Sequence, residues 1–109
     1  MPILVVKPSV NVPNEPQFKD IIISRMASGF FASKKSADNC LIIIITDGIS
    51  CKAGRIVSVT EKLVPPKSQN AKKWIKRIDV TFDSVRNLSF QEKTQISAIN
   101  WSSRNVRFI

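Results

Sequence analysis

The chain has 109 residues, of which 43% are hydrophobic, and this composition suits one domain with its own core and excludes a disordered chain. Seventeen Lys and Arg against eight Asp and Glu give a net charge of +9, and there is no His. The charge favours a polyanionic partner, whereas the lack of His removes the commonest general base and metal ligand. We therefore expect a single domain over residues 1–109 that binds and does not catalyse.

The N-terminal third is predicted to hold a strand and a helix. Ile3–Val6 is a short apolar run typical of a strand, and since no charged leader or long apolar stretch accompanies it, we expect no signal peptide. After three prolines, apolar residues at i, i+3 and i+4 predict an amphipathic helix over residues 15–29, with Gly29 at its end. The polar segment 33–39 predicts a loop.

The stretch Leu41–Ile45 is apolar at every position, which predicts a central strand that is covered on both faces. Asp47 and Gly48 follow, and this pair is typical of a two-residue hairpin turn into a second strand. The helix over residues 15–29 is expected to cover the face that holds Ile44. Apolarity on both faces also allows a homo-oligomer.

The two cysteines are expected to be reduced. In the register that a two-residue turn imposes, Cys51 faces Ile44 and Cys40 faces Arg55, so the two thiols are not placed for a disulfide. Two reduced thiols fit a cytoplasmic protein better than a secreted one.

Two long strands are predicted next. Gly54 marks a bend or a bulge, and residues 55–64 continue as a strand up to a Pro-Pro pair. From residue 74 to residue 83 polar and apolar side chains alternate, with Trp74 on the same side as Ile78. This pattern predicts a half-buried antiparallel partner strand, joined to the first by a long basic hairpin loop.

The C-terminal third leaves one alternative open. Ser89 and Glu92 fit a capping box that opens a helix through about residue 100, whereas residues 94–99 also fit a strand. Val106 and Phe108 are expected to point inward from a closing strand. The sequence thus predicts an α+β fold, with a small twisted, mostly antiparallel sheet or partly open β-barrel, an N-terminal helix and, in one alternative, a second helix near residues 90–100.

The densest group of charges surrounds Trp74, with four Lys and Arg in residues 72–77. Lys and Arg neutralise phosphates, and an indole offers a face on which a base can stack. Trp74 also has a structural alternative, because the side that it shares with Ile78 favours packing in the core. A second basic group ends the chain, and Lys52, Arg55 and Arg86 join it if the sheet curls. The predicted nucleic-acid-binding residues are Lys67, Lys72, Lys73, Trp74, Lys76, Arg77, Arg104 and Arg107.

Catalytic alternatives depend on carboxylates or thiols. Asp79 and Asp83 share a strand face but lie about 13 Å apart at ~3.3 Å per residue, which is too far for a two-metal site. Neither cysteine has a His to activate it, and the chain has no glycine-rich phosphate loop. A metal-dependent nuclease and a small basic ribonuclease remain alternatives for which no catalytic, metal or cofactor-binding residue can be assigned.

A strand, the Asp47-Gly48 turn, a second strand and Gly54, placed after an N-terminal helix, resemble the opening of small Sm-like barrels. In that family a turn of this kind joins two strongly bent strands behind a short helix, and the resemblance covers residues 15–64. The RNA-contacting loop signatures of the family are not visible here, and the connection over residues 65–73 differs. No site residue is therefore carried over.

The leading hypothesis is a non-catalytic cytoplasmic module that binds nucleic acid, either RNA or single-stranded DNA, through the basic hairpin and a sheet face. The alternative from another class is a small adaptor or inhibitor, of phage or mobile-element type, that binds another protein. Neither hypothesis involves a membrane or a cofactor.

Overall fold

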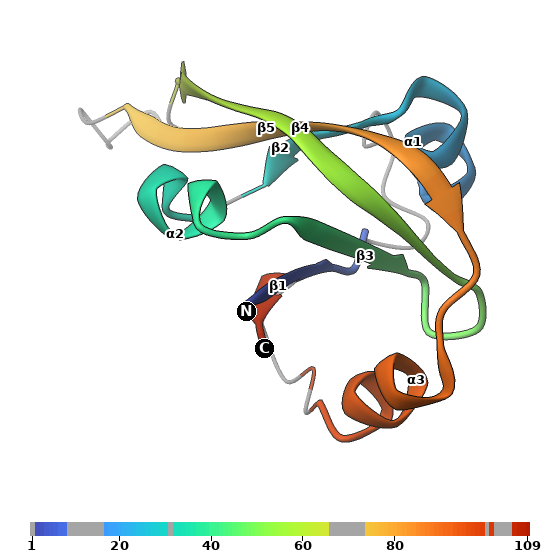
Figure 1. Ribbon diagram of the computed structural model, residues 1–109. Helices are drawn as coiled ribbons and strands as arrows, with labels where there is room; N and C mark the ends of the chain where they lie inside the picture. Colours follow the sequence, from blue (N-terminus) through green and yellow to red (C-terminus); the bar gives the residue numbers. More distant parts are fainter. Residues whose placement is uncertain (1, 9–16, 31, 66–73, 100, 102–105) are drawn as a thin grey trace.

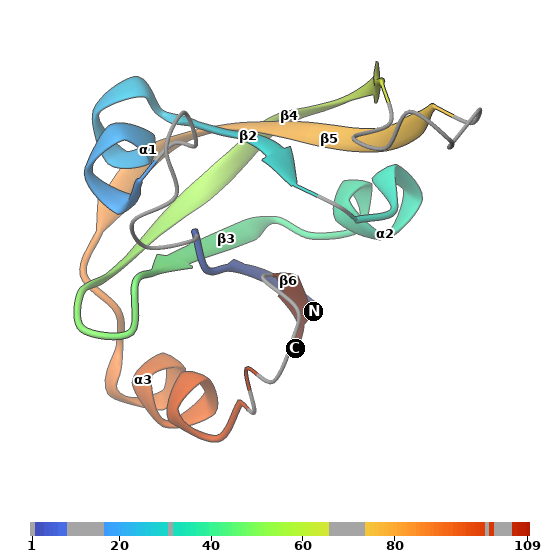
Figure 2. The same ribbon diagram turned by 180° about the vertical axis from the view of Figure 1, so that it is seen from behind.

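The helices and strands are arranged as an α+β fold (Figures 1 and 2). The computed structural model of the protein describes residues 2–8, 17–30, 32–65, 74–99, 101 and 106–109. These residues form β1 (Ile3–Val6), α1 (Phe18–Ser24), β2 (Met26–Phe30), α2 (Lys34–Asp38), β3 (Ile42–Thr46), β4 (Cys51–Val64), β5 (Ile75–Arg86), α3 (Phe90–Ser97) and β6 (Val106–Phe108). None of these three helices has the length and apolar composition needed to cross a membrane.

The strands form one sheet in the order β2-β5-β4-β3-β1-β6. β1 and β3 are parallel, and the other four pairings are antiparallel. The mostly antiparallel sheet is therefore confirmed over the described residues. Since β2 and β6 end this order as edge strands, the sheet is open and mixed, and the predicted barrel is not confirmed.

β3 lies at the centre of the fold, as its unbroken apolar sequence predicts. Ile43 and Ile45 are fully buried on one face, in a cluster with side chains of β1, β2, β5 and α1 that we call core 1. Ile44 is fully buried on the other face, with Leu88 and Ile96 of the C-terminal third, in core 2. Both faces of β3 are thus covered within one chain, which accounts for the two-sided apolarity that also allowed a homo-oligomer.

The helix α1 covers the opposite face of β3 from the one predicted. Its buried Ile21 belongs to core 1, whereas the face of Ile44 packs against the segment that contains α3. The prediction considered only the antiparallel neighbour of β3. The parallel neighbour β1 adds Leu4 and Val6 to core 1, and these residues make that face the more apolar one.

The connection between β3 and β4 is two residues longer than predicted. Cys51 pairs with Thr46 and not with Ile44, so the turn spans residues 47–50. The Asp47 carboxylate stabilises this longer turn, because it accepts hydrogen bonds from the backbone N–H groups of Ile49 and Ser50, at 2.8 and 2.6 Å. A shift of two residues leaves Cys51 and Ala53 on the face that holds Ile44, as predicted.

Both cysteines have free thiols. Cys40 lies before β3, and its burial raises the pKa of its thiol. Arg55, which was predicted to face Cys40 across the strands, pairs with Ile42 instead. The Sγ of Cys51 lies 3.2 Å from the Oγ1 of Thr46.

β4 bends at Gly54, as predicted. The register between β4 and β5 shifts beside Gly54 and again between Ile56 and Ser58. A Cβ at position 54 would lie only 2.7 Å from the Phe82 ring, so the close approach of the two strands requires glycine. The bend places the β2–β5 half of the sheet over the β1–β3 half, with core 1 between them (Figure 1).

The N-terminal helix predicted over residues 15–29 is not confirmed in that form. α1 ends at Ser24, and Arg25, which caps it, has a left-handed φ of 60°. Residues 26–30 form β2, and Gly29, expected to end the helix, lies in this strand with a φ of 77°. The helical spacing continues through Met26, but the hydrogen bonds to β5 override it. The predicted start of the helix lies outside the described residues.

Residues 33–39, predicted as a loop, contain the short helix α2. The Ser33 hydroxyl caps it by accepting a hydrogen bond from the Ser36 N–H at 3.3 Å, and Lys34 and Asp38 form an i, i+4 ion pair at 2.7 Å. Ala37 packs in core 1. The polar sequence conceals this helix because its one buried side chain is small.

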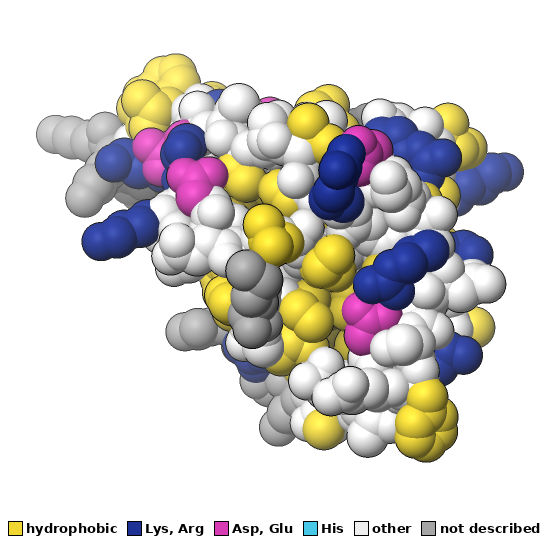
Figure 3. Space-filling model, in the orientation of Figure 1, with side chains coloured by type: hydrophobic (Ala, Val, Ile, Leu, Met, Phe, Trp, Pro, Cys, Tyr) yellow, Lys and Arg dark blue, Asp and Glu magenta, His cyan; other side chains and the backbone are white. Residues whose placement is uncertain are grey.

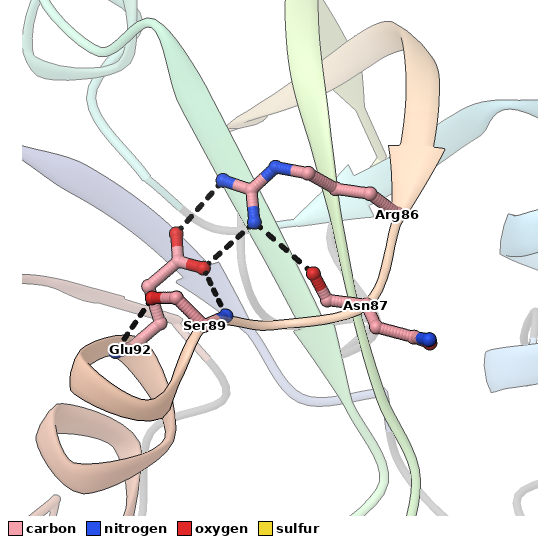
Figure 4. A network of polar contacts seen from close by, with 4 residues as sticks. All are labelled: Arg86, Asn87, Ser89 and Glu92. Atoms are coloured by element: carbon pink, nitrogen blue, oxygen red, sulfur yellow. Dashed lines mark hydrogen bonds and ion pairs between the residues drawn. The ribbon is translucent and has the colours of Figure 1, made fainter.

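The open alternative in the C-terminal third is decided in favour of a helix. In the capping box of α3, the Ser89 hydroxyl accepts from the Glu92 N–H, and the Glu92 carboxylate accepts from the Ser89 N–H. The same carboxylate receives two hydrogen bonds from the Arg86 guanidinium, at 2.7 and 2.9 Å (Figure 4). This pair ties the start of α3 to the end of β5.

The closing strand is confirmed as β6, which pairs with β1. Val106 packs against core 1, but Phe108 is exposed and not inward as predicted. The reason is that β6 is an edge strand, so its outer residues have less of the sheet to pack against.

β4 and β5 are much longer than the other strands and continue together past the rest of the sheet. β2 pairs with β5 as far as Ile78, and β3 pairs with β4 as far as Arg55. Beyond Ile78, residues 62–64 and 75–77 pair with each other over about 10 Å, and in the described part of the chain no third strand joins them. We call residues 62–65 and 74–77 the arm (Figures 1 and 2). The basic loop predicted between them lies outside the described residues.

Candidate nucleic-acid interface

The arm belongs to the most basic segment of the chain, since residues 62–77 contain six Lys and Arg and no Asp or Glu. Of the eight predicted nucleic-acid-binding residues, the structure describes Trp74, Lys76, Arg77 and Arg107. The other four, Lys67, Lys72, Lys73 and Arg104, lie outside the described residues.

Three of the four described residues lie together. Trp74, Lys76 and Arg77 belong to the arm, whereas Arg107 lies in β6, and three strands separate β6 from β5 in the sheet. The structure therefore does not bring Arg107 to the arm.

One face of the arm is apolar and cationic. Lys76 pairs across the strands with Leu63, so the two side chains share a face, and strand alternation places Trp74 on it as well. Leu63 is 59% exposed, Trp74 is 54% exposed, and Lys76 is exposed too. We call Trp74, Leu63 and Lys76 the Trp74 face.

Of the two alternatives for Trp74, packing in the core is therefore wrong. The alternation correctly predicts that Trp74 lies on the same side of the strand as Ile78. On that side Ile78, Val80 and Phe82 are fully buried in core 1. The arm, however, extends past the other members of core 1, so the same side of β5 is exposed at its start.

The opposite face of the arm is bound to the sheet. Lys62 and Arg77 are cross-strand partners on this face. Lys62 Nζ lies 3.2 Å from Asp79 Oδ1 and 3.1 Å from Ser28 Oγ, and Arg77 donates to the Gly29 carbonyl at 3.3 Å. These contacts fix two cations of the arm against β2.

Asp79 is the centre of these contacts. Its Oδ1 accepts hydrogen bonds from the Gly29 N–H at 2.8 Å and from the Ser28 hydroxyl at 2.9 Å. Partial burial raises the pKa of Asp79, but these two hydrogen bonds and the nearby Lys62 ammonium lower it by more, so the pKa lies below its ordinary value. The ionised carboxylate thus keeps Lys62 turned toward the sheet.

The cations that were expected to join a basic group have partners of their own. Arg55 makes two hydrogen bonds to Asp83, at 3.0 and 2.8 Å, Arg86 pairs with Glu92, and Lys52 donates to an asparagine side chain. On the face shown in Figure 3, Lys and Arg side chains lie in separate groups, with hydrophobic, acidic and other side chains between them. The described cations of that face therefore do not form one continuous patch.

The carboxylates considered for catalysis do not converge. Asp79 and Asp83 each make an ion pair, and Glu61 pairs across the strands with Ile78, so its side chain lies on the opposite face from Asp79. Among the residues that the structure describes, no group of three His, Cys, Asp or Glu is placed to hold a metal ion.

Sequence reasoning missed Leu63 as part of the candidate interface. Its place beside Lys76 follows from the register of β4 and β5, which the sequence alone does not define. The available signal was an apolar residue at the end of a strand, next to a Pro-Pro pair and a basic loop.

Comparison with known proteins assigns the chain to no family. No family model, no curated protein and no solved structure matches it.

Proposed function

We propose that the protein is a non-catalytic module that binds RNA or single-stranded DNA through the arm. The observation that carries the proposal is an exposed indole at Trp74 within a segment, residues 62–77, that has six Lys and Arg and no acidic residue. Lys and Arg neutralise phosphates and release counterions, and an indole stacks on bases of any sequence. Binding of this kind has limited sequence preference.

The net charge of +9 supports the proposal, because it attracts polyanions before contact. Each phosphate neutralised on a single strand lowers log K by about 0.7 for every tenfold rise in salt. Four such contacts would lower the affinity about 50-fold between about 50 and 200 mM salt.

The experiment compares two variants that carry the same net charge. Lys73→Glu with Lys76→Glu, the arm variant, changes the basic segment of residues 62–77, and Lys19→Glu with Lys93→Glu changes exposed positions on α1 and α3. Each double variant lowers the net charge from +9 by 4 to +5. Binding to mixed single-stranded oligonucleotides is measured over a series of salt concentrations. We expect a much larger loss of affinity and a shallower salt dependence for the arm variant. Equal losses in both variants, or no salt-sensitive binding by the unmodified protein, would contradict the proposal.

A protein partner is the second candidate, and exposed apolar side chains favour it. Ile49 at the β3–β4 turn is 95% exposed, and Phe90 in the first turn of α3 is 86% exposed. An adaptor or inhibitor could dock through such residues. Pull-down before and after nuclease treatment separates the candidates, because a partner held through nucleic acid is lost on treatment and a directly bound protein is retained.

We also propose a cytoplasmic location, which the two free thiols support. Fractionation of cells that express the tagged chain tests it.

A further inference from the structure

We infer that the Trp74 face binds one unpaired nucleotide, with the base against the Trp74 indole and the phosphate on Lys76. This inference rests on the proposed function and names the part of the arm, and the form of nucleic acid, that the contact uses.

The spacing of the three side chains suits one nucleotide. Trp74 and Lys76 are two residues apart on one side of an extended segment, a separation of about 6.6 Å along the strand. A flexible lysine side chain reaches a phosphate next to a base that is stacked two residues away. Leu63 lies directly across from Lys76 and adds apolar surface beside the indole.

The other face of the arm is less suited to the contact. Lys62 and Arg77 are held there by the Asp79 carboxylate and the Gly29 carbonyl, and their release would cost those interactions. On the Trp74 face, Lys76 makes no ion pair with a described residue. Glu61, the next residue on this face toward the sheet, limits the surface that a phosphate can approach.

An exposed indole also selects the form of nucleic acid. In a duplex each base is covered on both sides by its neighbours, so the ring of Trp74 cannot reach its face. In a single strand the base is free to leave its neighbours and stack on the indole. The Trp74 face should therefore favour unpaired strands, whereas charge alone favours the more densely charged duplex.

The test uses the full chain with oligo-dT and with an oligo-dA·oligo-dT duplex of the same length. Trp74→Ala removes the ring, Trp74→Phe keeps an aromatic face, and Phe90→Ala is the control, since it removes an even more exposed aromatic ring from α3. We expect Trp74→Ala to weaken oligo-dT binding about tenfold or more, and Trp74→Phe to restore most of the loss. Phe90→Ala should leave the affinity unchanged, and none of the variants should alter duplex binding more than about twofold. Thermal unfolding of each variant verifies that it is folded.

The outcomes separate this inference from the proposed function. Salt-sensitive binding to oligo-dT that Trp74→Ala leaves intact overturns the inference and spares the function. A loss of affinity in Trp74→Ala that is equal for duplex and single strand does the same. No salt-sensitive binding to either probe overturns both.

Discussion

Lys62 and Asp79 form an ion pair between β4 and β5, with Nζ and Oδ1 3.2 Å apart, at the point where the arm leaves the sheet. The same carboxylate binds Gly29 and Ser28 of β2, so one side chain joins three strands. Strand pairing alone would leave the base of the arm free to twist, because β2 stops pairing at Ile78. The Asp79 contacts therefore set the direction of the arm as well as the position of Lys62.

Asp79→Asn should release Lys62 and make it available to phosphate. We expect the salt dependence of oligonucleotide binding to steepen, and the free energy of unfolding to fall by about 1 kcal/mol as the ion pair is lost. Asp83→Asn is the matched control, because it raises the net charge by the same unit but frees Arg55, which lies outside the arm. If the two variants change the salt dependence equally, total charge and not the position of Lys62 determines binding.

Gly54→Ala should destabilise the fold more than any other glycine substitution in the chain. The added Cβ would lie 2.7 Å from the Phe82 ring and 3.2 Å from the Asp83 carbonyl oxygen. Overpacking of this kind costs about 2–3 kcal/mol, which urea unfolding measures. Gly48→Ala is the comparison, since its φ of 94° is strained for alanine but its nearest neighbour is 3.9 Å away, and about 1 kcal/mol is expected there. A smaller loss for Gly54→Ala would contradict the close approach of β4 and β5.

The two thiols should differ in reactivity. Cys40 is buried in core 1, and its pKa is raised by burial, whereas Cys51 is only partly buried. Since the thiolate is the reactive form, a thiol reagent should modify Cys51 first and Cys40 only after unfolding. Mass spectrometry after limited labelling identifies the modified residue, and equal labelling of both in the folded protein would contradict this expectation.

Local pattern predicted most strands of this fold but not what covers them. The apolar run at Ile42–Ile45 and the alternation before Phe82 are properties of a few consecutive residues, so β3 and β5 could be predicted directly. The helical spacing that continues through Met26 predicted a longer helix, because only the contact of residues 26–30 with β5, fifty residues away, makes them a strand. Trp74 was placed on the correct side of its strand, yet its exposure depends on where β2 and β3 stop, which no local pattern records. The sequence thus predicted the candidate interface as a basic segment. It did not predict that one face of this segment is exposed and the other contacts the sheet.

The pair between Arg86 and Glu92 should make stability depend on pH in the acid range. The Arg86 hydrogen bonds, opposed by partial burial and assisted by Ser89, lower the pKa of Glu92 from 4.5 to about 2 (Figure 4). Because the folded-state pKa is lowered, the stabilisation is complete above about pH 4.5 and is lost as pH falls from there toward 2. A shift of 4.5 minus 2, or 2.5 units, sets an upper limit of about 3 kcal/mol, and since the Arg86 side chain is 46% exposed we expect about 1–2 kcal/mol.

Glu92→Gln should therefore lower the free energy of unfolding by about 1–2 kcal/mol at neutral pH, and the difference from the unmodified protein should vanish near pH 2. Denaturant unfolding at several pH values measures both. Asp38→Asn is the control, because its ion pair with Lys34 is exposed on both sides and should contribute less than about 0.5 kcal/mol at any pH. No loss in Glu92→Gln would mean that the capping hydrogen bond to Ser89, and not the charge of the carboxylate, holds α3 to β5, since glutamine keeps an acceptor oxygen but cannot carry the charge. A loss that does not change with pH would likewise contradict a role for the charge.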